Sequence, residues 1–306
     1  MNIDAKLVKD LRERTGAGMM DCKKALADTA GDIEKAVAVL REKGLAGASK
    51  KAGRVAADGL VGVLSSPDSK SAVVFELNCE TDFVAKTDAF RALLQTLGAA
   101  LLAADVTEGS GDTVSGLKVE GGKTIAALLT ESIAQIGENI GLRRFSRFAS
   151  KNGVVGSYVH AGGKIGVLVE IAGGDSRHIE LARSLAMQVA AAFPRCVSRD
   201  EIAAGDLAAE REIYRQQALS SGKPEKIVDR IVDGKIEKFY SEICLLEQEY
   251  VRDSDLRVDK LVAQSAKETG ASLSVSRFAR FQLGEGIEKK QSNLADEVAQ
   301  TIGQSA

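Results

Sequence analysis

The chain has 306 residues, of which 44% are hydrophobic, and this length predicts two or three domains with ordinary apolar cores. Lys and Arg number 41 and Asp and Glu number 43. This balance excludes the strongly basic surface typical of proteins that bind nucleic acid, so we expect no direct nucleic-acid partner.

The sequence also argues against membrane insertion and against a disulfide framework. No run of residues approaches the roughly 18 apolar residues of a membrane span, and the first residues mix acidic with basic side chains, unlike a signal peptide. We therefore expect a cytoplasmic protein without membrane contact. Cys22, Cys79, Cys196 and Cys244 are far apart and form no C-x-x-C motif, which predicts reduced, mostly buried thiols.

The first part of the chain has the pattern of three short helices. Apolar residues recur there every three or four positions in three successive stretches. Residues 15–18 separate the first stretch from the second, Asp32 suits the N-cap of the third, and Gly44 suits its C-terminal cap. We predict a three-helix module over residues 1–50, followed by a small, basic tether to about residue 57.

The middle of the chain contains an internal repeat. The segment GLVGVLSSPDSKSAVVFEL from Gly59 aligns without a gap with GVVGSYVHAGGKIGVLVEI from Gly153, and each copy reads as strand, turn and strand. A helical pattern follows each hairpin, and RFSRF at residues 144–148 matches RFARF at residues 277–281. The phenylalanines in these last segments are three apart rather than two, so we predict strands that contain a β-bulge.

The repeat predicts an α+β fold with two related halves. The second copy is longer than the first, and its surplus has two amphipathic patterns on either side of residues 221–224, which predicts an antiparallel helical hairpin that projects from the body. In chain order we expect half N over residues 58–150, half C over residues 151–198 and 247–286, the inserted hairpin over residues 199–246, and a C-terminal helix over residues 287–306.

Three features could suggest an enzyme, and none has the required pattern. GLKVEGGKT at residues 116–124 resembles a phosphate-binding loop, but its glycine spacing is wrong, so we predict an exposed loop before a helix. Neither His160 nor His178 has an acidic residue placed to assist it; His160 could be a surface contact, and we expect His178 to be solvated. Cys79, beside Glu80, lacks a neighbour that would lower its thiol pKa. We expect no catalytic residue, no metal and no cofactor.

The segment NCETDFVAK at residues 78–86 places Phe83 beside Asp82 in a polar loop after a buried strand. In one interpretation Phe83 folds beneath the loop while Asp82 caps the turn toward Lys86. In the other, Phe83 is exposed and contacts a partner, where burial of the ring would contribute about 1.5 to 3 kcal/mol. The second copy of the repeat has no Phe-Val pair here, so the shared fold does not require one, which favours the partner contact.

The neighbouring pair Met19 and Met20 also allows two interpretations. Methionine at helical spacing usually fills a core, and we expect this for one of the two. A module of this size cannot easily bury both, and an exposed methionine is an adaptable surface for contact with another protein.

Five segments, in order along essentially the whole chain, resemble the bacterial elongation factor Ts family. They are LRERTGAGMMDCKKAL at residues 11–26, KKAGRVAADG at residues 50–59, NCETDFVAK at residues 78–86, KIGVLVE at residues 164–170 and GEGIEK at residues 284–289. The resemblance implies a ubiquitin-associated-like N-terminal module and two related α+β halves. It also implies guanine-nucleotide exchange on elongation factor Tu, the GTPase that delivers aminoacyl-tRNA to the ribosome, without covalent chemistry.

The same resemblance implies a site. The loop that the family inserts near the magnesium and phosphate site of Tu corresponds to Thr81, Asp82, Phe83 and Val84. Further contact surfaces correspond to Arg12, Met19 and Met20 in the module and to His160 in the second half. Two other classes compete with this interpretation: an enzyme of the thiol or phosphate-transfer type, and a scaffolding protein that binds Tu without accelerating GDP release. The sequence leaves the stoichiometry of the Tu complex open.

Overall fold

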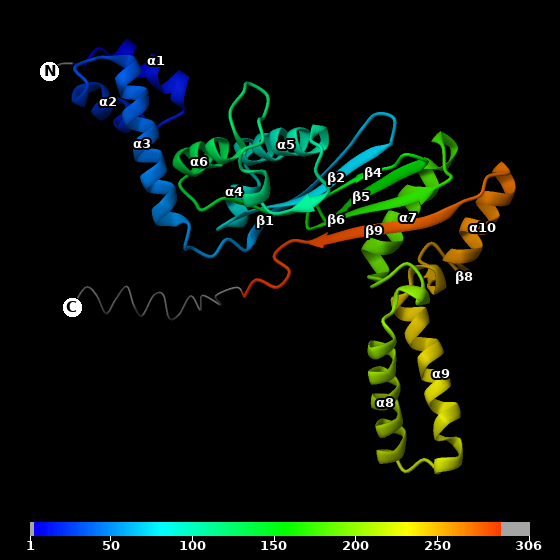
Figure 1. Ribbon diagram of the computed structural model, residues 1–306. Helices are drawn as coiled ribbons and strands as arrows, with labels where there is room; N and C mark the ends of the chain where they lie inside the picture. Colours follow the sequence, from blue (N-terminus) through cyan, green and yellow to red (C-terminus); the bar gives the residue numbers. More distant parts are fainter. Residues whose placement is uncertain (1–2, 289–306) are drawn as a thin grey trace.

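The structure is a computed structural model that describes residues 3–288 (Figure 1). Helices come first, and strands mixed with helices follow, so the predicted α+β class is confirmed. The predicted C-terminal helix from residue 287 onward lies almost entirely outside the described residues, and the division into domains at the expected boundaries stays a prediction. In the described part of the chain, no helix is both long and apolar enough to cross a bilayer.

Three helices form the N-terminal module: α1 (Ala5–Thr15), α2 (Met19–Asp28) and α3 (Ile33–Lys51). They enclose a small core of their own that includes Leu11, Cys22 and Leu26. Asp32 caps α3 as predicted, because its carboxylate accepts a hydrogen bond from the Lys35 amide at 3.1 Å.

The prediction that α3 ends at Gly44 is wrong. The helix continues to Lys51 and packs along α6 (Ile125–Ile136). A Cβ at Gly44 would lie 3.4 Å from the Cβ of Ala134, and Ala48 packs against the core of the first half. This packing outweighs the glycine's tendency to end a helix. The helix therefore extends to the start of the predicted tether, and residues 52–57 are not helical.

The first half is a four-stranded sheet in the order β1-β2-β4-β3. Its helices lie on one face of the sheet, where β2, α5 and α6 share a continuous core. The bounds of its remaining elements are β1 (Asp58–Ser65), β2 (Ser71–Cys79), α4 (Asp82–Ala85), α5 (Asp88–Ala103), β3 (Glu108–Gly109), η1 (Asp112–Val114) and β4 (Gly141–Ala149).

The second half repeats the plan with a three-stranded sheet in the order β5-β6-β9, covered by α7, with α10 packed against α7 at one end (Figure 1). A small two-stranded sheet, β7-β8, precedes α10. The bounds are β5 (Gly153–His160), β6 (Ile165–Ala172), η2 (Ser176–His178), α7 (Ile179–Ala192), η3 (Arg199–Glu201), η4 (Leu245–Glu247), β7 (Glu249–Tyr250), β8 (Asp253–Arg257), α10 (Val258–Thr269) and β9 (Ser274–Gln282).

Strand register confirms the internal repeat. Gly59 pairs with Asn78 in the first hairpin, and Gly153 pairs with Ala172 at the equivalent place in the second. Each last strand contains a bulge at an equivalent position, because pairing shifts directly after Glu76 in β2 and directly after Glu170 in β6. The bulge does not explain the phenylalanine spacing as predicted: pairing is regular over residues 144–149, and Phe145 and Phe148 pack on opposite faces of the sheet. The two halves therefore share strand register and irregularities as well as sequence.

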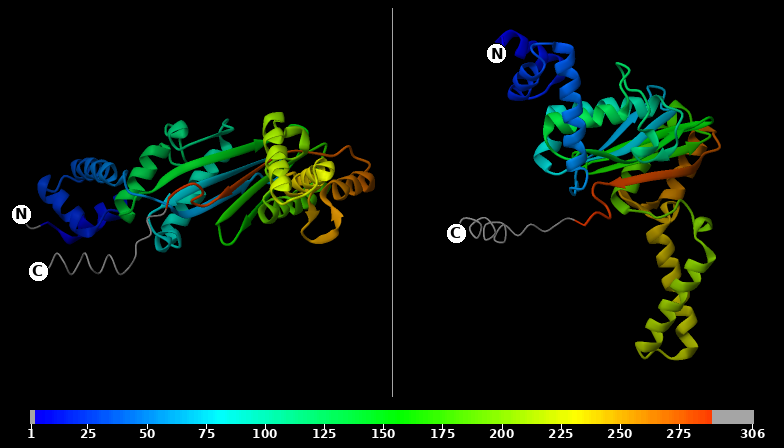
Figure 2. Two further views of the ribbon diagram at one scale, coloured as in Figure 1. Left: turned by 90° about the horizontal axis from the view of Figure 1, so that it is seen from below. Right: turned by 60° about the vertical axis from the view of Figure 1, so that its left-hand side comes forward.

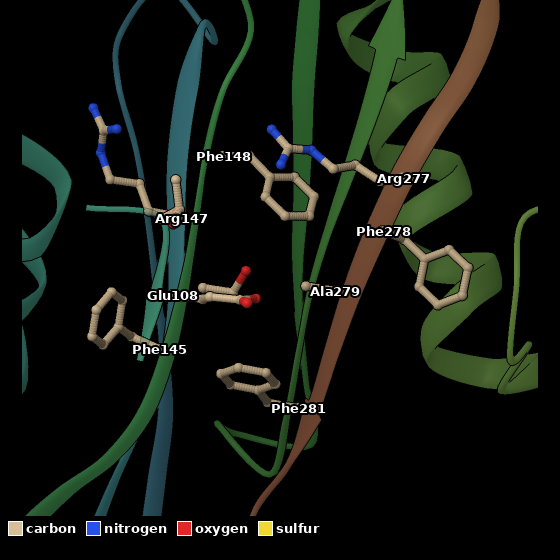
Figure 3. Close-up of a pocket in the computed structure, with 10 residues that line it drawn as sticks. Glu108, Phe145, Arg147, Phe148, Arg277, Phe278, Ala279 and Phe281 are labelled. Carbon is tan, nitrogen blue, oxygen red and sulfur yellow. The ribbon is translucent and has the colours of Figure 1, made fainter. Parts of the chain in front are cut away.

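The two sheets pack against each other through their inner faces, around a core that includes Val74, Phe148 and Leu168. At the edge of this interface β4 and β9 line a groove of about 300 Å³ (Figure 3). Across the groove the contacts are reciprocal: the Arg277 guanidinium carbon lies 4.1 Å from the Phe148 ring centre, and that of Arg144 lies 4.4 Å from the ring centre of Phe281.

The predicted helical hairpin is present as α8 (Ala204–Ser220) and α9 (Glu225–Ile243). Figures 1 and 2 show the two helices projecting together from the core, far from the N-terminal module. They share an apolar seam that includes Ala218, Val228 and Val232. Ion pairs such as that of Arg211 with Asp233, at 2.6 Å, join their outer faces.

Candidate functional site

The segment that follows β2 presents an exposed aromatic ring on a short, fixed helix. β2 is buried almost throughout and ends at Cys79, after which Thr81 caps the single turn of α4 by accepting a hydrogen bond from the Val84 amide at 3.4 Å. Ala85 is buried, and Val84 packs against the core of the first half. Phe83 points the other way and is 78% exposed, so the interpretation that buries it beneath the loop is wrong.

Glu138, between α6 and β4, holds this segment in place. One of its carboxylate oxygens accepts the amides of Glu80 and Thr81, both at 3.0 Å, and the other accepts the Thr81 hydroxyl at 2.6 Å. The Glu80 carboxylate in turn accepts the Asn139 amide at 2.6 Å. Sequence reasoning missed Glu138, because nothing local to it indicates a contact with a loop 57 residues earlier.

Asp82 and Lys86 form an ion pair of 2.6 Å beside the exposed ring, and the Lys86 ammonium lies 5.7 Å from the centre of Phe83. The hydrogen bond from Lys86 lowers the pKa of Asp82, and the charges of Lys86 and Lys164 lower it further, so the carboxylate is ionised at neutral pH. The interpretation that buried Phe83 also made Asp82 the cap of the turn, and this is wrong because Thr81 provides the helix cap, although Asp82 does contact Lys86.

The β5-β6 hairpin of the second half lies at the same end of the core as the Thr81–Val84 segment. The turn between β5 and β6 lies against β1, where the Gly163 carbonyl accepts the Val61 amide at 2.7 Å. Lys164, which influences Asp82, follows this turn directly. His160 is exposed before the turn, with its Nδ1 atom 3.0 Å from the Tyr158 hydroxyl oxygen. The structure therefore brings the hairpin that carries His160 near the Thr81–Val84 segment.

The three expected contact residues of the module are all exposed. Met19 is 55% and Met20 is 74% exposed, so the expectation that one of them fills the core is wrong. Cys22, Ala25 and Leu26 occupy the inner face of α2 instead. Arg12 is also exposed. The module rests on α6, where the Thr15 carbonyl accepts a hydrogen bond from Gln135 at 2.9 Å.

Comparison with known proteins gives the family of the chain. The family described as "Elongation factor TS" matches residues 80–285. Proteins named elongation factor Ts from Clostridium botulinum (strain Alaska E43), Clostridium perfringens (strain SM101) and Clostridium acetobutylicum are 54%, 51% and 49% identical to this chain, over 98%, 98% and 99% of its length and 99% of theirs. The chain belongs to the elongation factor Ts family. The resemblance seen in the sequence segments is thereby confirmed, and the chain is a translation elongation factor.

The residues that could suggest an enzyme have structural roles in this elongation factor. His178 is fully buried, contrary to expectation: its Nδ1 accepts the Asp175 amide at 3.0 Å, and its Nε2 lies 2.9 Å from the Thr269 hydroxyl oxygen. All four cysteines are buried and free, as predicted. Burial, followed by the charge of Glu138, raises the pKa of Cys79 to about 12, so its thiol is un-ionised at neutral pH.

Two further expectations concern the 116–124 loop and metal binding. The loop is largely exposed and leads into α6, whose N-cap is Thr124, so it is a helix entry as predicted. Among residues 3–288, no three His, Cys, Asp or Glu side chains come together in a way that could hold a metal ion.

Glu138→Ala is expected to lower the free energy of unfolding by about 1 to 2 kcal/mol, because two backbone N–H groups lose their acceptor. Glu138→Gln keeps an acceptor oxygen and should retain most of the stability. Urea unfolding measures the change, and hydrogen exchange of residues 78–86 locates it. Glu131→Ala is the control, since its exposed ion pair with Lys123 should contribute little. Equal stability of Glu138→Ala and the unaltered chain would reject this role.

Proposed function

We propose that the chain is the guanine-nucleotide exchange factor for elongation factor Tu and acts in the cytoplasm. It binds Tu with GDP and promotes GDP release by disturbing the Mg²⁺ and phosphate site with residues Thr81 to Val84, after which GTP binds. The observation that carries the proposal is Phe83, a ring 78% exposed on a helix that the core and Glu138 hold fixed. The family name of the relatives supports it.

The ring and the carboxylate have separate roles in this mechanism. Tu holds GDP through its phosphates and a bridging Mg²⁺, so a conformation of Tu with displaced phosphate contacts weakens metal and nucleotide together. Phe83 stabilises that conformation by burying its ring in Tu, which contributes on the order of 1.5 to 3 kcal/mol. Asp82, ionised beside the ring, repels phosphate charge or redirects a hydrogen bond. Since α4 is already ordered, little conformational entropy is lost on binding.

Exchange of this kind needs no covalent step. The factor by which the chain weakens GDP binding equals the factor by which GDP weakens binding of the chain, because the coupling free energy between two ligands of Tu is reciprocal. The chain is therefore released when a nucleotide rebinds and can act again. We propose no catalytic residue and no cofactor for it.

A direct test compares GDP release from Tu with and without this chain, by stopped-flow fluorescence of a labelled GDP. Acceleration is the expected result. Binding to Tu without faster release would support the scaffolding alternative, and turnover of a nucleotide by the chain alone would support the enzyme alternative. Either result would overturn the proposal.

The N-terminal module and the β5-β6 hairpin supply further contacts with Tu in this proposal, through Arg12, Met19, Met20 and His160. Changing both methionines to alanine is expected to weaken Tu binding about tenfold, since each exposed side chain loses apolar surface that Tu would bury. The stability of the chain should change by less than about 0.5 kcal/mol. Calorimetric titration with Tu measures the affinity, and thermal unfolding measures the stability. Unchanged affinity would remove the methionines from the contact surface.

A further inference from the structure

Two cysteines face each other at the base of the helical hairpin. Cys196 lies between α7 and η3, before the hairpin begins, and Cys244 follows the last residue of α9. Their Sγ atoms are 3.6 Å apart. The other two thiols have different partners: Cys22 donates to the Ala17 carbonyl at 3.7 Å and Cys79 to that of Thr81 at 3.1 Å. Cys196 and Cys244 thus form a close thiol pair.

The backbone holds the two residues side by side. Cys196 and Cys244 form a parallel bridge, in which the Cys196 carbonyl accepts the Leu245 amide at 2.9 Å and the Cys196 amide donates to Ile243 at 3.2 Å. Neighbouring strands lie about 4.8 Å apart. A disulfide requires a Cα separation of about 4.4 to 6.8 Å. Side-chain rotation can therefore bring the two sulfurs into bonding distance without moving the backbone.

We propose that Cys196 and Cys244 are a modification site, a dithiol that a low-molecular-weight disulfide converts into an intramolecular disulfide bond across the base of the α8-α9 hairpin. The bond would join the two points where the hairpin leaves and re-enters the second half. The hairpin would then be fixed to the core covalently, in addition to its apolar seam.

The reaction proceeds in two exchange steps. The Cys196 thiolate attacks one sulfur of the small disulfide, forms a mixed disulfide and releases one small thiolate. The Cys244 thiolate then attacks the Cys196 sulfur, forms the protein disulfide and releases the second small thiolate. Two protein thiols are oxidised, one small disulfide is reduced to two thiols, and the two protons pass from the cysteines to the released thiolates.

Burial determines which sulfur reacts first and how fast. Cys196 is 9% exposed and Cys244 is fully buried, so Cys196 meets the reagent first. Burial raises the pKa of both thiols, that of Cys244 to about 12, which keeps the pair un-ionised while the base is closed. Arg199 closes the base through ion pairs with Glu237 and Glu247. Oxidation is therefore slow and follows opening of the base.

Peptide mapping tests the proposal on the full chain. The protein is incubated with oxidised glutathione until the thiol count is constant, its remaining thiols are alkylated, and it is digested with trypsin. We expect a loss of two of the four thiols and a disulfide joining the peptides CVSR and FYSEICLLEQEYVR. Cys22 and Cys79 remain alkylated and provide the internal control. Dithiothreitol should restore all four thiols, and the oxidised chain should unfold at a higher temperature than the reduced chain.

Single variants separate the two steps. In Cys244→Ser the Cys196 thiol should stop at the mixed disulfide with glutathione, whereas in Cys196→Ser the fully buried Cys244 thiol should stay free. Neither variant should give the joined peptide. If either variant fails to fold, the peptide map of the unaltered chain is sufficient to test the proposal. No loss of thiols, an equal loss at all four cysteines, or a disulfide between two chains would overturn the proposal.

Discussion

Phe83→Ala is expected to slow the GDP release that this chain promotes by about tenfold to a hundredfold, because the ring contributes on the order of 1.5 to 3 kcal/mol when Tu buries it. The fold should be unaffected, since the ring is 78% exposed and outside the core of the first half. The measurement is stopped-flow release of labelled GDP from Tu, with the concentration of the variant varied to saturation.

Phe193→Ala provides a matched control for this experiment. Phe193 is also an exposed phenylalanine, but it follows α7 in the second half, whereas α4 belongs to the first half. Its ring stacks on the Arg280 guanidinium, and its loss should leave GDP release unchanged. A wild-type rate of release with Phe83→Ala would eliminate the ring as the group that disturbs the nucleotide site. An equal effect of both variants would show a non-specific cause.

Glu76→Ala is expected to destabilise the fold by about 3 to 5 kcal/mol, the range for removing one partner of a buried ion pair. The Glu76 side chain is fully buried in β2 and accepts hydrogen bonds from Arg143 at 3.1 Å and from Arg144 at 2.7 Å. The Gly284 amide also donates to it at 2.8 Å, so one carboxylate joins the first sheet to the end of the second half. Removing it takes the buried carboxylate away from both guanidinium groups, although Arg144 keeps its ion pair with Glu285 at 3.0 Å. Urea unfolding measures the loss.

The internal repeat supplies the control for Glu76. Glu170 occupies the equivalent position in β6 and pairs with Arg277 at 2.8 Å, but the Arg277 side chain is 46% exposed. Glu170→Ala should therefore cost about 1 kcal/mol. Similar losses for the two variants would contradict the special role of Glu76.

The stabilising contribution of Glu76 should also depend on pH. Burial alone would raise its pKa, but the hydrogen bonds from Gly284, Arg144 and Asn78 outweigh burial and lower the pKa below the ordinary value of 4.5. The folded protein thus holds the proton less tightly than the unfolded chain. The contribution is complete above pH 4.5 and is lost as the pH falls through the lower folded-state pKa. Glu76→Ala should remove this part of the acid sensitivity.

Sequence reasoning succeeded where local patterns carry the information. The repeat predicted two matching hairpins, because its two copies align without a gap, and the two hairpins have equivalent strand registers. The absence of a Phe-Val pair in the second copy pointed to the exposure of Phe83. Both inferences used only short segments of the chain.

The errors and omissions concern contacts between distant segments. Gly44 suits a helix end, but the contact of α3 with α6 extends the helix beyond it. His178 is buried with its ring against Thr269, which is 91 residues away. Glu138 and Glu76 have no sequence signal, since each acts through hydrogen bonds to segments that only the folded chain brings near.

The reciprocal stacking of Arg144 on Phe281 and Arg277 on Phe148 makes the halves dependent on each other. Each half supplies the ring that the other half's arginine covers. Unfolding of either sheet would therefore leave a phenylalanine ring and an arginine of the other sheet without their stacking partners. We consequently expect the two sheets to gain or lose order as one cooperative unit, even though each half contains its own copy of the repeat. Heating should therefore give a single transition for the two sheets together.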